Sequence, residues 1–122
     1  MNQNKRNFSV IKRLKSFKHA YDGLKSAFSE HNFKIHIAIA FLVIVAGVLL
    51  NISKFEWLII VLTISLVIIC EIINTAIEKL ADFISPQWDD KIKVIKDLAA
   101  AAVLISATAA FLVGLIIFVP KI

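Results

Sequence analysis

The chain has few of the residues that build the common nucleotide, zinc and nucleophile motifs. Its 122 residues include one cysteine and three glycines. Cys70 cannot form an internal disulfide alone, and no Cys/His group has the spacing of a zinc site. The glycines stand apart, so no glycine-rich loop can wrap phosphates with backbone N–H groups, and no serine lies in a nucleophile-elbow sequence. If a nucleotide binds, side chains and a cation must hold it.

Long hydrophobic runs are what the chain does have. Hydrophobic residues make up 59% of the sequence, well above the content of a soluble globular protein. Three apolar stretches match the length needed to cross a hydrocarbon layer of roughly 30 Å. We expect residues 1–122 to form a single all-α, membrane-embedded domain whose transmembrane helices cover about residues 33–52, 57–82 and 96–119.

Lysine and arginine are distributed unevenly about these stretches. Eight precede the first stretch, four lie between the second and the third, and Lys54 and Lys121 fall on the other side. The positive-inside rule therefore predicts a cytoplasmic N-terminus and an outside C-terminus. The net charge of +5 suits anionic lipid and phosphate, so a nucleic-acid partner is not needed to explain it.

The segment before the first stretch has its own pattern. Its large apolar residues recur at spacings of four and three, while lysines occupy other faces. The pattern predicts an amphipathic helix at about residues 8–30 on the inner membrane surface. The alternative is a helix packed on a neighbouring subunit. The apolar positions are Val10, Leu14, Phe17, Tyr21, Leu24 and Phe28.

A polar stripe interrupts the second apolar stretch. Its members stand at i, i+3, i+4, i+7 and i+11, so all of them project from one helix face. A carboxylate near the middle of a transmembrane helix costs roughly 2.5 to 3.5 kcal/mol on insertion scales, which points to a functional need. The stripe consists of Glu71, Asn74, Thr75, Glu78 and Asp82.

Further charged residues are expected at the same membrane depth. Glu30 precedes the first stretch, and Lys96 with Asp97 begins the third. Hard oxygen ligands suit Mg²⁺, which makes Glu30 and Glu78 candidate ligands. Lys96 lies in the first turn of a predicted helix, where the dipole favours phosphate. Glu71 lies on the order of 10 Å deeper than Glu78 at helical rise, where it could meet a lipid hydroxyl.

Structural interpretations of the same residues stay open. Glu71 could be a protonated acid bonded to a neighbouring helix, and Asn74 and Thr75 could simply tie helices together. The charges at the helix ends could be solvated or could cap helices. His31 and His36 flank the predicted inner interface, where an anchoring role is expected.

The run Glu-Ile-Ile-Asn-Thr-Ala-Ile-Glu at residues 71–78, followed by Asp82, Lys96-Asp97 and an Ala-rich stretch, closely resembles a family signature. It is that of the prokaryotic diacylglycerol kinases and undecaprenol kinases, which are small integral-membrane lipid kinases. The likeness covers about residues 17–115. It implies a multi-pass homotrimer in the bacterial cytoplasmic membrane, with active sites between subunits, a surface helix, ATP as donor and Mg²⁺ as cofactor.

The resemblance also implies roles for individual residues. They are a general base at Glu71, metal-binding carboxylates at Glu30 and Glu78, a signature amide at Asn74 beside Thr75, phosphate contacts at Lys96 and Asp97, a further acid at Asp82, and a nucleotide-holding base at Lys12 or Arg13. In that scheme Glu71 takes the proton of a lipid alcohol as its oxygen attacks the γ-phosphorus of ATP.

Some positions depart from the enterobacterial diacylglycerol kinases. There is a one-residue deletion near Ser29, His36 replaces an acid, and residues 87–89 replace a loop that approaches the adenine. Residues 30–36 look more like the undecaprenol kinases of Gram-positive bacteria. Undecaprenol is therefore the expected acceptor, with diacylglycerol as the alternative.

Two other classes of protein would also carry acids within a membrane. A small channel or transporter subunit would use them for an ion path, and a purely structural subunit would use them for packing. The predicted position of the charges at the cytoplasmic end, and the lack of charge inside the first stretch, argue against an ion path.

Overall fold

Four α-helices in chain order make up the structure, a computed structural model that describes residues 3–122. Nowhere in that range does the backbone form a strand. A short 3-10 turn, η1, follows the last helix. The elements are α1 (Gln3–Phe28), α2 (His31–Leu49), α3 (Lys54–Ile84), α4 (Asp90–Phe118) and η1 (Val119–Lys121).

Three of these helices, α2, α3 and α4, are long and apolar enough to cross a membrane. The prediction of an all-helical protein with three spans is confirmed at this level. Helix α3 has 31 residues and is about 46 Å long at helical rise, which exceeds the roughly 30 Å of hydrocarbon. If its start lies at one membrane boundary, its last turns extend beyond the other boundary. The polar stripe then begins at Glu71, just inside that boundary, and continues into those turns.

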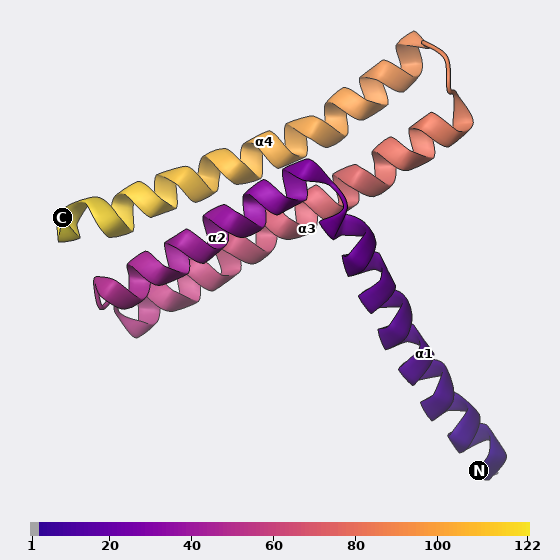
Figure 1. The fold of residues 1–122 in the computed structure, drawn as a ribbon, viewed down its shortest axis with the longest axis horizontal. Helices are drawn as coiled ribbons and strands as arrows, with labels where there is room; N and C mark the ends of the chain where they lie inside the picture. The colour runs from indigo at the N-terminus through magenta and orange to yellow at the C-terminus, as the bar shows by residue number, and fades with distance from the viewer. Residues whose placement is uncertain (1–2) are drawn as a thin grey trace.

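Helix α3 is the centre of the bundle. It packs along α4 over the most extensive helix contact of the structure and also packs against α2. Figure 1 shows these three helices side by side, with α1 leaving the bundle where α2 begins. Within the described chain the contacts of α1 with the other helices are few and fall mainly on α2.

Local side-chain chemistry explains where α3 and α4 begin. Ser53 and Glu56 form a capping box, in which the Glu56 N–H donates to Ser53 Oγ at 3.1 Å and the Ser53 N–H donates to Glu56 Oε1 at 3.0 Å. Asp89 Oδ1 accepts from the backbone N–H groups of Lys91 and Ile92 at 2.8 and 3.3 Å. This cap starts α4 at Asp90, six residues before the predicted span, so the prediction that Lys96 lies in the first turn of its helix is wrong.

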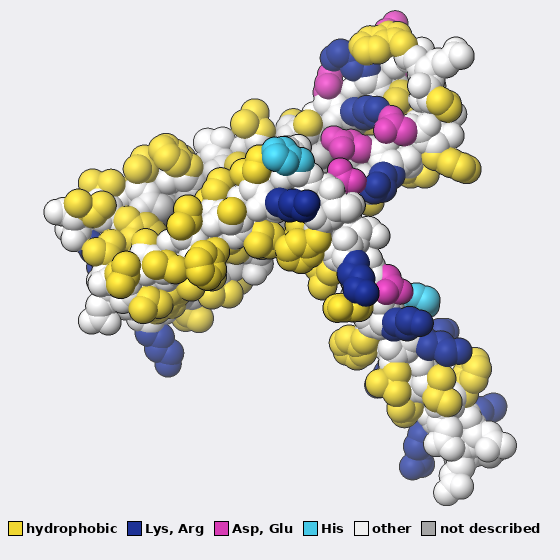
Figure 2. Space-filling view, in the orientation of Figure 1, with side chains coloured by type: hydrophobic (Ala, Val, Ile, Leu, Met, Phe, Trp, Pro, Cys, Tyr) yellow, Lys and Arg dark blue, Asp and Glu magenta, His cyan; other side chains and the backbone are white. Residues whose placement is uncertain are grey.

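The small buried core lies near the connection between α2 and α3. Ile52, Ile60 and Ile117 form it, and Trp57 packs against it. Trp57 also crosses α2 at Gly47, where an added Cβ would lie 2.7 Å from the indole Cη2. Most other large apolar side chains are exposed on the protein surface, and Figure 2 shows them covering much of the bundle. Such a surface is suited to lipid or to another protein chain.

Helix α1 is continuous through the region predicted as a surface helix. It begins at Gln3 and ends at Phe28, after which Ser29 and Glu30 form the turn into α2. Its large apolar side chains are all exposed, including Leu14 and Phe17. Figure 2 shows hydrophobic and basic side chains together along this helix.

Candidate active site

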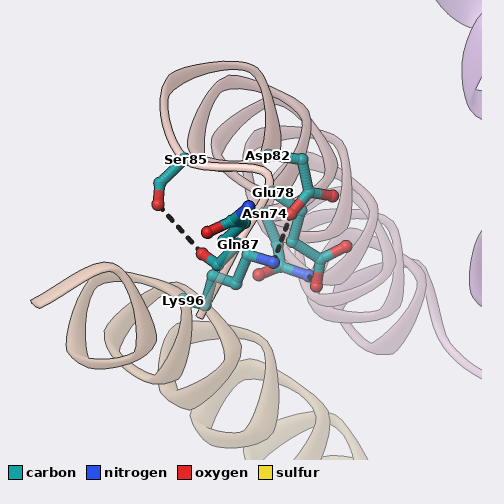
Figure 3. Close-up of polar contacts among 6 residues, drawn as sticks. All are labelled: Asn74, Glu78, Asp82, Ser85, Gln87 and Lys96. Atoms are coloured by element: carbon teal, nitrogen blue, oxygen red, sulfur yellow. Dashed lines mark hydrogen bonds and ion pairs between the residues drawn. The ribbon is translucent and has the colours of Figure 1, made fainter. Parts of the chain in front are cut away.

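The polar stripe runs along the last four turns of α3 and is buried at its deep end. Glu71 and Asn74 are only 3% and 6% exposed. Thr75 is half-buried, while Glu78 and Asp82 are exposed. Figure 3 shows Asn74, Glu78 and Asp82 following one another along the helix. The stripe thus passes from a buried acid to accessible acids within one helix face.

Glu71 is paired with a histidine from α2. Its Oε2 lies 3.4 Å from His36 Nε2, and this is the one ion-pair contact of Glu71 among residues 3–122. The His36 side chain is 20% exposed and that of Glu71 is 4% exposed. The imidazole therefore lies between the buried carboxylate and more accessible space.

One turn closer to the helix end, Asn74 and Glu78 contact each other. Asn74 Nδ2 donates to Glu78 Oε1 at 3.2 Å. The amide oxygen, Asn74 Oδ1, is buried and has no hydrogen-bond partner in the described part of the chain. A buried acceptor without a partner costs about 1 to 3 kcal/mol, so this oxygen is suited to a bound group.

Glu30 connects the turn between α1 and α2 to the same part of α3. Its Oε1 lies 3.2 Å from Lys79 Nζ, and Lys79 directly follows Glu78. Glu30 is half-buried at the start of α2, where its side chain makes no cap hydrogen bond. The structure thus brings Glu30 to the level of Glu78, although each carboxylate has a different partner.

Charged residues also join α3 to the start of α4. Lys96 Nζ pairs with Asp82 Oδ1 across the two helices, as Figure 3 shows. Lys93 pairs with Asp97 at 2.5 Å along α4. These four side chains line a cavity of about 250 Å³ together with the connecting loop. In that loop Trp88 Nε1 donates to Asp90 Oδ1 at 2.9 Å.

The charge balance singles out Glu78. Glu71, Glu30, Asp82 and Asp97 each lie within ion-pair distance of a His or Lys side chain. Within residues 3–122 Glu78 has no such partner, and the unpartnered amide oxygen of Asn74 lies beside it. No three His, Cys, Asp or Glu side chains of the described chain converge as a metal cluster. Mg²⁺ does not require one, because it commonly binds one or two carboxylates and fills its other positions with phosphate and water.

Two of the predicted site residues lie far from this group. Lys12 and Arg13 are exposed on α1, which projects away from the bundle (Figure 1). At helical rise Lys12 is about 24 Å along the axis from Phe28. Within one chain, the described structure therefore does not bring these basic residues to the polar stripe.

An apolar groove runs along the bundle from the level of the stripe. It has a volume of about 400 Å³ and is lined by α2, α3 and α4. His36 and Thr63 are its polar side chains, and the Thr63 hydroxyl donates to the Ile59 carbonyl at 2.7 Å. His36 is therefore the lining residue with a polar group directed to the stripe.

Sequence reasoning missed two of these contacts. The sequence predicts an interfacial anchor at His36, and it includes Lys79 only among the four basic residues between the second and third apolar stretches. The pairing of each with an acid depends on which faces of α2 and α3 meet. Two features of the sequence could have drawn attention to His36: its place at the start of an apolar run, directly after Ile35, and its replacement of an acid of the enterobacterial diacylglycerol kinases.

Comparison with known proteins gives a consistent result. Residues 18–118 match the family described as "Prokaryotic diacylglycerol kinase". The chain is 41% identical to an undecaprenol kinase of Bacillus subtilis over 109 residues, which cover 88% of this chain and 89% of the relative. It is 38% identical to a diacylglycerol kinase of Synechocystis, covering 88% of this chain and 62% of that protein. It is 33% identical to a diacylglycerol kinase of Helicobacter pylori, covering 80% and 83%.

Proposed function

Because the chain belongs to the prokaryotic diacylglycerol kinase family, we propose that it is a membrane lipid kinase that transfers the γ-phosphoryl group of ATP to undecaprenol. The undecaprenol kinase of Bacillus subtilis, at 41% identity over most of both chains, supports this acceptor. Residues 30–36 support it as well, since their sequence resembles that branch of the family. The product would be undecaprenyl phosphate.

The observation that carries this proposal is the position of Glu71. It is a carboxylate buried in a membrane-spanning helix, about two turns from the accessible Glu78. A lipid hydroxyl approaching within the membrane and a triphosphate approaching from water can meet between these two levels. A purely structural acid would not require the further polar and charged groups that gather near it, namely the Asn74 amide and the carboxylates of Glu30 and Asp82.

In the proposed reaction, Glu71 acts as general base. It accepts the proton of the lipid hydroxyl as the hydroxyl oxygen forms its bond to the γ-phosphorus, and the bond from that phosphorus to the bridging oxygen of ADP breaks. Positioning and electrostatic stabilisation supply most of the acceleration in such transfers. Lys96, paired with Asp82 at the mouth of the site, offsets charge on the phosphates.

We propose Glu78 and Glu30 as the residues that hold Mg²⁺. The support is the donor set: a carboxylate at Glu78 that has no cationic partner in the described chain, the unpartnered Asn74 Oδ1 beside it, and Glu30 at the same level of α3. When bound, the ion neutralises charge on the β- and γ-phosphates. Asn74 orients Glu78 through its amide N–H. Thr75 lies next to Asn74 on the same face of α3.

In this proposal the nucleotide site needs residues from two subunits. Lys96, Asp82 and Asp97 line a cavity between α3 and α4 that is suited to phosphate and ribose groups. Lys12 and Arg13 lie too far along α1 to join it within one chain. We propose a homotrimer in which α1 of one subunit supplies Lys12 or Arg13 to the site of a neighbour.

We also propose a topology, based on the distribution of basic residues. The N-terminus and the α3–α4 connection lie in the bacterial cytoplasm, where ATP is available, and the C-terminus lies outside. Lys121 Nζ pairs with Glu56 Oε1 at 3.1 Å at the opposite end of α3 from the polar stripe, so these two charges would face the outer side.

The test is a kinase assay on the purified protein in mixed micelles. With Mg-ATP, undecaprenol should be converted to undecaprenyl phosphate faster than diacylglycerol is converted to phosphatidic acid at equal mole fraction. Faster conversion of diacylglycerol would identify it as the acceptor instead. Failure to phosphorylate either lipid, together with ion flux through proteoliposomes, would contradict the kinase proposal and favour a transporter.

A further inference from the structure

The pairing of His36 with Glu71 suggests a role for the histidine that the proposed function does not include. We propose that His36 is a positioning residue that holds the carboxylate of Glu71 in the orientation needed to accept the proton of the lipid alcohol. This inference rests on the proposed function, and it adds a residue from α2 to a site otherwise built from α3, α4 and the α1–α2 turn.

The geometry of the pair supports this role. His36 Nε2 lies 3.4 Å from Oε2 of Glu71. The imidazole approaches Oε2, and among residues 3–122 no ion-pair partner lies at Oε1, so Oε1 is left for the substrate proton. A glutamate has three side-chain torsions, and in the described chain His36 is the one ion-pair partner that restrains them.

The location of His36 supports the role as well. The residue lines the apolar groove between α2, α3 and α4, whereas Glu71 does not. Its side chain is 20% exposed against 4% for that of Glu71. The imidazole thus contacts both the groove and the buried acid, at the depth where a lipid hydroxyl must meet the general base.

An anchoring histidine would behave differently. An anchor at the membrane interface requires water or a lipid headgroup, and its removal would change stability or insertion but not the chemical step. A positioning residue acts on the step itself, because a misplacement of about 1 Å at the reacting groups can reduce the rate about 10²-fold. The two roles can therefore be separated by kinetics.

The experiment compares His36→Ala with His36→Gln and with His31→Ala, a control that removes an exposed histidine from the first turn of the same helix. We expect His36→Ala to lower kcat by about 10-fold to 10²-fold with little change in the KM for Mg-ATP. His36→Gln should recover part of the loss, because its amide can donate to the carboxylate. His31→Ala should keep wild-type kinetics.

A double-mutant cycle with Glu71→Asp tests whether His36 acts through Glu71. The shorter acid cannot reach the imidazole in the same way, so His36→Ala should reduce kcat much less in that background.

Wild-type kcat in His36→Ala, or an equal loss of kcat in both backgrounds, would overturn the inference while the kinase proposal stands. The inference would also be overturned if the loss of kcat in His36→Ala matched a lower melting temperature in detergent and His36→Gln recovered none of it. A wild-type protein that phosphorylates no lipid would instead overturn the proposed function on which the inference rests.

Discussion

Glu71 is a carboxylate within an apolar helix, and its surroundings explain how such a residue is tolerated. An ionised acid near the bilayer centre costs roughly 2.5 to 3.5 kcal/mol on insertion scales. His36 lies against one of its oxygens, and the stripe continues from it toward the helix end. The buried acid is thus part of a connected polar face and not an isolated charge.

The first prediction concerns this acid. Glu71→Gln keeps the size of the side chain but removes the proton acceptor, so turnover with undecaprenol should fall by about 10² to 10⁴. Binding of Mg-ATP, measured by calorimetry on the purified protein, should remain, because the nucleotide contacts lie elsewhere. Wild-type turnover in this variant would show that Glu71 is not the base.

The second prediction concerns Glu78, the stripe carboxylate without a cationic partner. Glu78→Gln should raise the Mg²⁺ concentration that gives half-maximal activity by about 10-fold or more, in the range found when groups at metal sites are altered. Asp22→Asn is the matched control, since it removes one carboxylate charge from α1, outside the stripe. Chelation of Mg²⁺ should abolish activity of the wild type. An unchanged Mg²⁺ dependence in Glu78→Gln would contradict the assignment.

At the scale of elements, the length of α3 determines where chemistry can occur. Its capping box sets the start of the helix at Lys54, and its 31 residues extend past the hydrocarbon layer. Thus the same helix supplies a lipid-level acid and water-accessible acids. In helix α4 the position of the start also determines where a charged residue lies. The Asp89 cap starts the helix six residues before Lys96, and Lys96 pairs with Asp82 of α3.

The third prediction tests the contact between Gly47 of α2 and Trp57 of α3, at the end of α3 away from the polar stripe. Gly47→Ala would bring a Cβ to within 2.7 Å of the rigid Trp57 ring, so the contact of α2 with α3 must shift. We expect a loss of about 1 to 3 kcal/mol, typical of overpacking, seen as a lower melting temperature in detergent. Gly23→Ala is the control, because no atom lies within 4 Å of the added Cβ. Equal stability of the two variants would mean that the α2–α3 packing differs from the structure.

In the whole molecule, α1 is the helix with the fewest contacts to the rest of the described chain. It leaves the bundle (Figure 1), exposes its apolar side chains and carries Lys12 and Arg13 away from the acids of its own chain. A membrane surface accounts for the apolar residues. In the proposed homotrimer, a neighbouring subunit would bring the basic residues to a set of acids.

The fourth prediction follows from that arrangement. Glu71→Gln subunits and Lys12→Ala/Arg13→Ala subunits should each be inactive alone. Co-assembled at equal amounts, they should regain roughly one quarter of wild-type activity, because about one quarter of the sites then combine an intact Glu71 from one subunit with an intact Lys12 and Arg13 from its neighbour. The measurement is lipid phosphorylation after co-expression with two affinity tags.

The control for this experiment mixes Glu71→Gln with Glu78→Gln subunits. Both positions lie on α3 of one chain, so no site of this mixture contains both intact acids, and activity should not exceed that of Glu78→Gln subunits measured alone at the same Mg²⁺ concentration. No recovery in the first mixture, with mixed oligomers verified by the two tags, would contradict shared sites.

Several features of the protein depend only on local sequence pattern. Hydropathy indicated three spans, and the spacing from Glu71 to Asp82 indicated one polar face, because helical periodicity alone decides which side chains share a face. The residues 71–78 indicated the family, which the comparisons confirmed. The pairing of acids with basic residues between helices follows from helix packing instead. The pairs are Glu71 with His36, Glu30 with Lys79, and Asp82 with Lys96. These pairs depend on the rotation and the register of each helix against its neighbours, and packing sets both, whereas hydropathy does not.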